Sequence, residues 1–194
     1  MSQRLIISLF LVFLFVAIRT VPVYAGEQIA RALANLSPMA ALALCGGMFL
    51  PKRTGVLLTF GAFIISDTLL NLHYQQPLFN AYSIILFVSF ATLFGVGYFI
   101  GNRAGPSILL CAGIGGTFLF YVFTNSAAYF YDPSYPRGYS GWIQALTTGL
   151  PGFPPTWVFG LRSLVGNLVF AFAFYIVLRP QTENAGLYAA TRAA

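Results

Sequence analysis

The chain has 194 residues, of which 58% are hydrophobic and only 7% are charged, and its ten Lys and Arg outnumber its four Asp and Glu. Soluble domains carry about 25% charged residues, so this composition excludes an ordinary soluble globular protein. The basic residues stand singly between apolar runs, apart from Lys52–Arg53, which is typical of topology signals and argues against nucleic-acid binding. The apolar runs are continuous, so the sequence predicts an all-α integral membrane protein in the lipid bilayer, not a barrel.

The first apolar run, Leu5–Tyr24, has two interpretations. A basic start, a short apolar stretch and small residues up to Ala25 are typical of a secretory signal peptide. The same residues form an uncleaved transmembrane helix if Arg19 extends its charged end to an interface, and we favour this helix. The next segment, Gly26–Asn35, has apolar residues at helical spacing and is expected to lie along the membrane surface.

The second run, Leu36–Leu50, is short for a full span of about 20 residues. It is rich in Ala and Gly, which let helices approach closely, so we expect it inside the bundle. Four longer runs complete a predicted bundle of about six transmembrane helices: Gly55–Leu72, Tyr82–Gly101, Ser107–Asn125 and Leu161–Leu178.

Before the last run, the segment Ser126–Gly160 contains five prolines and both tryptophans. It predicts an aromatic loop with a short helix at Ser140–Leu150, anchored at headgroup level by Trp142 and Trp157. We expect one transmembrane domain over residues 1–180 and a polar, loose tail over residues 181–194. Six spans place both termini on one side, and the distribution of Lys and Arg favours the cytoplasmic side.

Asp67 is the only carboxylate within a predicted span. An ionisable group at membrane depth is costly and usually faces a protein interior, although a place near a helix end also lets it reach the interface. We favour the interior and predict a functional site at Asp67. Asn71 shares its helix face, and His73 follows half a turn further on, either in a polar pocket or as an interfacial residue.

Two further polar clusters are candidates for a ligand site. Asn125 and Tyr135 flank the aromatic loop, which either caps a pocket or holds only a local Asp132–Arg137 pair of little energetic value. In the last span, Asn167 needs a hydrogen-bond partner, for which Asp67 is the natural candidate, and Arg162 either contacts ligand or extends to the interface. The predicted substrate-binding residues are therefore Asp67, Asn71, His73, Asn125, Tyr135, Arg162 and Asn167.

Enzyme signatures are missing from the sequence. It contains no zinc-protease, serine-hydrolase, Walker or CxxC motif. Since His73 is the single histidine, a multi-histidine metal or haem site is excluded. We therefore expect a protein that is not an enzyme and that carries no metal and no cofactor.

Several pieces of the chain, in order, resemble a family of uncharacterised bacterial integral membrane proteins described only as transport proteins. These pieces are Asn35–Phe49, Ile65–His73, Thr124–Phe130, Tyr135–Pro136 and Leu150–Phe170. At the level of fold, the size and polar pattern are also similar to the S components of energy-coupling-factor transporters.

The resemblance implies signature positions at Asp67, His73 and Asn125, and a multi-pass protein of the bacterial inner membrane. Gly166–Asn167 stands where the family pattern has Gly-Asp. The missing second acid disfavours a proton path that needs two intramembrane carboxylates.

The leading hypothesis is a small-solute transport or substrate-binding membrane protein, similar to an S component. Its energy would come from partner subunits docked on small-residue helix faces such as Ala40–Gly47. Its pocket is expected between the helix of Asp67, the fifth span and the aromatic loop. The alternative is a non-catalytic structural or accessory subunit of a larger membrane complex. A polar-lined cavity at Asp67 favours the first hypothesis, and a tightly packed Asp67 favours the second.

Overall fold

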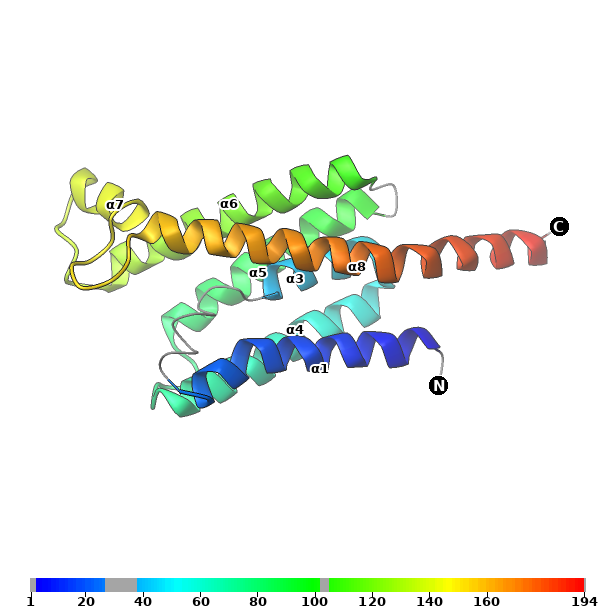
Figure 1. Ribbon diagram of the computed structural model, residues 1–194, viewed down its shortest axis with the longest axis horizontal. Helices are drawn as coiled ribbons and strands as arrows, with labels where there is room; N and C mark the ends of the chain where they lie inside the picture. The colour runs from blue at the N-terminus through cyan, green and yellow to red at the C-terminus, as the bar shows by residue number, and fades with distance from the viewer. Residues whose placement is uncertain (1–2, 27–37, 102–104, 194) are drawn as a thin grey trace.

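The computed structural model describes residues 3–26, 38–101 and 105–193, so the surface segment expected at 26–35 lies outside the described residues apart from Gly26. Within these ranges the chain forms seven helices, as Figure 1 shows: α1 (Gln3–Tyr24), α3 (Met39–Phe49), α4 (Lys52–His73), α5 (Ala81–Ile100), α6 (Pro106–Tyr131), α7 (Tyr139–Leu146) and α8 (Thr156–Ala193). The prediction of an all-α protein is confirmed.

About six transmembrane helices were expected, and the described residues contain fewer helices of full spanning length. Among the described residues, four helices are long and apolar enough to span a membrane: α4, α5, α6 and the part of α8 over Thr156–Val177. Two apolar helices are shorter, Val12–Tyr24 within α1 and Met39–Phe49 in α3. The chain is therefore a multi-pass helical membrane protein with four long spans and two shorter apolar helices.

The helix ends follow local chemistry. The Asn80 side chain caps α5 by accepting a hydrogen bond of 2.8 Å from the backbone N–H of Ser83. α5 ends at Gly101, whose φ of 61° is a left-handed value that glycine adopts without steric cost. Pro106 occupies the first turn of α6, where its missing N–H is not needed.

The last helix extends further than the predicted span Leu161–Leu178. α8 continues to Ala193, so the backbone of the tail expected to be loose from residue 181 is helical up to that point. Residues after Pro180 include several Ala together with Glu, Gln, Leu and Arg, which are good helix formers and sustain the helix beyond the proline.

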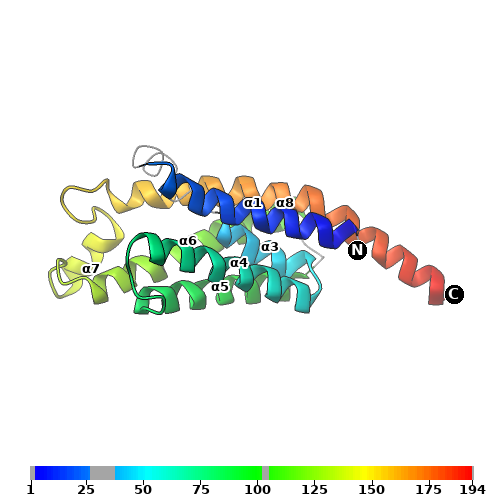
Figure 2. The ribbon, with the colours of Figure 1, turned by 90° about the horizontal axis from the view of Figure 1, so that it is seen from below.

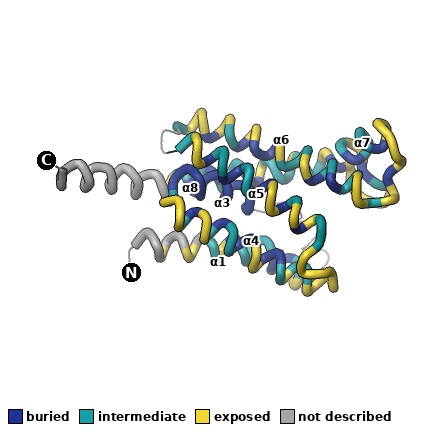
Figure 3. Tube along the Cα trace, turned by 180° about the vertical axis from the view of Figure 1, so that it is seen from behind, coloured by how far each residue is buried: buried dark blue, intermediate teal, exposed yellow. Residues whose placement is uncertain are grey.

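α3 is the centre of the bundle. All eleven of its residues are buried, and Figure 3 shows it as a dark segment surrounded by the longer helices. This confirms that the short Ala- and Gly-rich run lies inside the bundle. It also shows that residues 40–47 cannot dock a partner subunit, because helices of the same chain already cover them.

Glycines set the distance between α3 and its neighbours. A Cβ on Gly97 of α5 would collide with the Leu44 carbonyl of α3, and one on Gly47 would collide with the Phe94 carbonyl of α5. On the other side, a Cβ on Gly55 of α4 would lie 2.6 Å from the Gly46 carbonyl. The backbones of α3, α4 and α5 are therefore in direct contact, as small residues permit between membrane helices.

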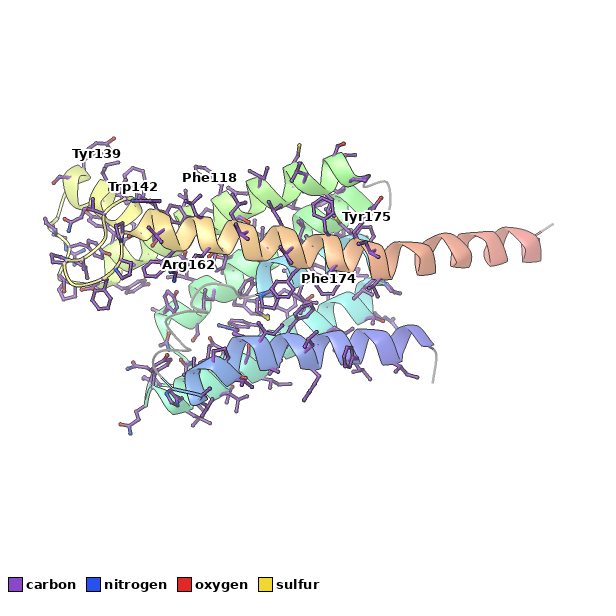
Figure 4. The ribbon with its side chains drawn as sticks, viewed as in Figure 1. Phe118, Tyr139, Trp142, Arg162, Phe174 and Tyr175 are labelled. Atoms are coloured by element: carbon purple, nitrogen blue, oxygen red, sulfur yellow. The ribbon has the colours of Figure 1, made fainter. Side chains whose placement is uncertain are left out.

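The chain crosses the bundle back and forth. α1 and α4 lie side by side at one edge, and both termini lie at the same end of the molecule (Figures 1 and 2). α7 and the aromatic loop lie at the opposite end, where Tyr139 and Trp142 are seen in Figure 4. The short helix expected at Ser140–Leu150 corresponds to α7, although Trp157 belongs to the start of α8.

We predict that Gly97→Ala destabilises the bundle. The new methyl group meets backbone and not a flexible side chain, so the cost exceeds the gain of about 1 kcal/mol that alanine brings to a helix. Thermal unfolding in detergent should show a Tm at least about 5 °C lower. Gly95→Ala, in the same helix with open space around its Cβ position, is the matched control. Equal Tm values for the two variants would contradict the close packing of α3 on α5.

Candidate functional site

Asp67 lies on the inward face of α4. The buried residues of this helix recur at helical spacing and include Thr59, Phe63 and Ser66. The face carries Asp67 toward the protein, where only 8% of its surface remains exposed. The expectation that this acid faces the interior, and does not simply reach the membrane interface, is confirmed.

Three helices contribute to a polar cluster around Asp67. The Arg19 guanidinium of α1 forms an ion pair of 3.4 Å with Oδ1 of Asp67 and donates a 2.7 Å hydrogen bond to Ser66 Oγ. Ser83 Oγ of α5 donates to Oδ2 of Asp67 at 2.7 Å, and Asn71 Nδ2 donates to the same oxygen at 3.2 Å. The predicted pairing of Asp67 with Asn71 on one helix face is confirmed, and α1, α4 and α5 meet at one carboxylate.

Arg19 is a site residue that the sequence interpretation placed wrongly. It was expected to extend to the interface, but its side chain turns inward, with 11% exposed, and lies 5.7 Å from the Phe63 ring centre. By turning inward, Arg19 pairs with the Asp67 carboxylate, and lipid cannot supply such a counter-charge. The paired orientation is therefore favoured over extension to the membrane interface.

A signal for this pair existed in the sequence. Arg19 and Asp67 each lie less than two turns before the end of a long apolar run. They reach the same depth because α1 and α4 run parallel, as the 2.8 Å hydrogen bond from Tyr24 Oη to the Leu69 carbonyl shows. Ser83, by contrast, had no signal, because a serine in a membrane helix commonly bonds its own backbone.

His73 does not join the Asp67 cluster. Its ring packs edge-on against Tyr24 and Tyr74, with centroids 4.7 and 5.0 Å away. It lies about 1.7 turns further along α4, which is a rise of about 9 Å along the helix axis at 1.5 Å per residue. The structure therefore places His73 at the helix end and does not bring it to the carboxylate.

Asn167 is buried but pairs with a different residue from the one expected. Its Nδ2 donates to Thr117 Oγ1 of α6 at 3.1 Å, so the predicted pairing with Asp67 is wrong. The two helices α6 and α8 lie side by side and bring these residues together, whereas α4 packs on the other side of α3. Among the described residues, Asn167 Oδ1 has no hydrogen-bond partner, and Asn167 is one of the residues that line a cavity of about 10 Å³.

The aromatic loop holds its polar residues locally. Asn125 Nδ2 donates to the Tyr121 carbonyl of its own helix at 2.8 Å, and Tyr135 is buried within the loop. Arg137 donates to the Tyr129 and Phe130 carbonyls and not to Asp132, so the local ion pair considered as one alternative for this loop does not form among its described residues. Asp132 accepts a hydrogen bond from the backbone N–H of Ser134, which lowers the pKa of its carboxyl. Arg162 lies half-buried on α8 (Figure 4).

A cavity of about 340 Å³ lies beside Asp67, between α4 and α5. Its walls are mostly apolar, with three polar side chains, and the lining residues are Phe63, Ile64, Asp67, Thr68, Leu78, Phe79, Ser83, Ile84 and Phe87. The pocket was expected to involve the fifth span and the aromatic loop, but neither lines it. Of the predicted binding residues, Asp67 alone lines this cavity. Asn71 does not line it but donates a hydrogen bond to Asp67.

A second cavity, of about 420 Å³, lies between α5 and α6. Ser89 and Ser126 are its only hydroxyl groups apart from Tyr131, and no charged side chain lines it. Both cavities have three polar side chains in their walls, but only the first contains a buried charged group, so the cavity beside Asp67 is the stronger candidate site.

Comparison with known proteins matches one family. The family model described as "Family of unknown function (DUF6580)" matches residues 1–184. No curated protein and no solved structure matches the chain. The resemblance to an uncharacterised family is thus confirmed at that level, while the transport role and the likeness to S components stay predictions.

We predict that Arg19 and Asp67 are energetically coupled. Breaking a buried ion pair by removing one partner leaves an uncompensated charge and costs about 3–5 kcal/mol, so Arg19→Met and Asp67→Leu should each destabilise the protein strongly. The double variant removes both charges and should be more stable than the sum of the single effects predicts, by at least about 1 kcal/mol. Unfolding titrations in detergent measure this cycle. Strict additivity would show that the pair does not hold α1 on α4.

Proposed function

The chain belongs to the DUF6580 family of unknown function, and we propose that it is a small-solute-binding membrane protein that takes part in transport. In this proposal it resembles an S component, which binds the solute while other subunits supply energy. The sequence contains no nucleotide-hydrolysing motif, so energy would have to come from a partner. The proposed role is binding and not catalysis.

One observation carries the proposal. The carboxylate of Asp67 and the hydroxyl of Ser83 lie together in the wall of a cavity of about 340 Å³. Ligand sites are typically concave, largely apolar and about 300–1,000 Å³ in volume, with a few fixed polar groups that orient the ligand. This cavity has that composition.

The polar groups divide into two roles. Asp67, Thr68 and Ser83 line the cavity and are the proposed contact residues. Asn71 and Arg19 do not line it but hold Asp67 at 3.2 and 3.4 Å, which makes them positioning residues. The remaining predicted binding residues do not line the cavity and are not proposed as ligand contacts: His73, Asn125, Tyr135, Arg162 and Asn167.

A partner subunit would need a surface other than α3. Gly61 of α4 and Gly95 of α5 both have open space at the Cβ position, so a neighbouring helix can approach the backbone there. We therefore place the proposed partner contact on the outer faces of these longer helices.

An accessory role is the second candidate, and a specific observation favours it. Asp67 is already hydrogen-bonded or paired to Arg19, Asn71 and Ser83 within the chain. A carboxylate satisfied in this way can act purely to assemble α1, α4 and α5. In that case the cavity would hold only lipid chains and no specific ligand.

We predict that Ser83→Ala, extracted from native membrane in nanodiscs, loses a small molecule that the wild-type protein retains. The change removes a wall hydroxyl and one donor to Asp67 but leaves the Arg19–Asp67 pair in place, so the fold should persist. Mass spectrometry of the bound small molecules measures the effect, and a loss of at least about tenfold corresponds to one good hydrogen bond.

Ser89→Ala is the matched control, since Ser89 is a buried serine of the same helix that bonds its own backbone and does not line this cavity. A wild-type protein that retains no small molecule, or that loses it equally in both variants, would favour the accessory role.

A further inference from the structure

The cavity beside Asp67 opens sideways, between two candidate membrane spans. Ile64 of α4 and Ile84 of α5 line it and are 57% and 60% exposed. Phe79, in the connection between the helices, also lines it and is 92% exposed. Side chains that lie within membrane spans and point outward face lipid. Ile64 and Ile84, which flank the opening from two candidate spans, are therefore expected to face the bilayer.

The charge of the wall is balanced inside the protein. Asp67 is the only charged residue in the lining, and Arg19 compensates it from behind. A cationic ligand would have to compete with an arginine that is already in place, and an anionic ligand would be repelled by the carboxylate. In a low-dielectric site both situations are costly, so the wall favours an uncharged ligand.

The hydrogen-bonding pattern of the wall specifies a donor on the ligand. Asp67 Oδ2 accepts bonds from Ser83 and Asn71, whereas Oδ1 has only the long 3.4 Å contact with Arg19. A carboxylate has about four acceptor positions, so Oδ1 retains capacity for one more donor. Ser83 Oγ donates its proton to Asp67 and already accepts a 3.3 Å hydrogen bond from Asn71 Nδ2, so it can accept from at most one further donor. The wall thus suits a hydroxyl or similar donor.

The depth of the wall separates a polar level from an apolar one. Asp67 lies about 9 Å along α4 from the helix end at His73. Phe63 and Phe87 lie one turn deeper on α4 and α5, and both line the cavity. A ligand whose polar end meets Asp67 would therefore extend its apolar body along these two rings, toward the middle of the membrane.

We propose that the ligand of this cavity is an uncharged, lipophilic molecule with a hydroxyl-type head group, which enters from the bilayer through the opening between α4 and α5. This inference rests on the proposed function and names its substrate class. It differs from a water-soluble solute that would reach the protein from the aqueous side. The volume of about 340 Å³, at the lower end of ligand sites, limits the bound part to a small molecule or a short chain.

A photolabelling experiment tests the class of ligand. The protein in phosphatidylcholine nanodiscs is exposed to a ten-carbon alcohol carrying a terminal diazirine, and to the matched amine and carboxylate. Mass spectrometry locates the labelled residues. The alcohol should label the cavity lining, and the two charged probes should label it at least about tenfold less, because their charge has no free partner there.

Two adjacent isoleucines supply a matched pair of variants. Ile64 lines the cavity and Ile65 does not, although both are outward-facing, at 57% and 53% exposed. Ile64→Trp should block the opening and abolish cavity labelling by the alcohol, whereas Ile65→Trp should leave it unchanged. Both changes lie on the lipid-facing surface, so the fold should persist in each.

The outcomes separate this inference from the function it rests on. Equal labelling by all three probes, preference for a charged probe, or labelling that survives Ile64→Trp would overturn the inference. If the native protein nevertheless retains a charged or water-soluble molecule that Ser83→Ala releases, the binding function stands and only the ligand class fails. If no probe labels the cavity and nothing is retained, both proposals fail.

Discussion

A carboxylate within a membrane helix has to find its partners inside the protein, and this requirement organises one half of the molecule. Lipid offers Asp67 neither water nor counter-charge, so Arg19, Ser83 and Asn71 supply them from three helices. Because each of these contacts is short-ranged, satisfying Asp67 fixes the depth of α1 against α4 and the rotation of α5. The same contacts fix the chemistry of the adjacent cavity, since the Asp67 carboxylate presents an acceptor whose charge Arg19 already balances.

The centre of the bundle, around α3, depends on backbone contact and not on charge. α3 is too short to span a bilayer alone and is buried by α4, α5, α6 and α8. Apolar side chains gain little by leaving lipid for a helix interface, so association relies on close packing. Gly46, Gly47, Gly55 and Gly97 bring the backbones together to provide it. This closely packed core supports the charged cluster at one edge, and the cavity beside Asp67 lies next to that cluster, between α4 and α5.

The features that sequence reasoning recovered are those that depend on local pattern. Continuous apolar runs predicted both ends of α4 and α5 to within about three residues, whereas α6 continues to Tyr131, past the predicted end at Asn125. Small residues predicted that α3 is internal. The lone acid in a span predicted the site, and the spacing to Asn71 predicted one of its partners. The errors concern contacts between distant segments. Arg19 was assigned to the interface, but its side chain bonds Ser66 beside Asp67. Asn167 was paired with Asp67, but α8 packs against α6 and Asn167 donates to Thr117 instead.

By itself, the sequence determined that this is a helical membrane protein, where its main helices lie and that Asp67 is its buried acid, because hydrophobicity and helical spacing are properties of consecutive residues. Only the tertiary structure decided which arginine compensates Asp67, which serine joins it and where the cavity opens. Those outcomes depend on how helices far apart in the chain pack, and many helix pairings satisfy the same hydrophobic pattern. The site at Asp67 can therefore be predicted from the sequence of α4, but it is completed by Arg19 from α1 and Ser83 from α5.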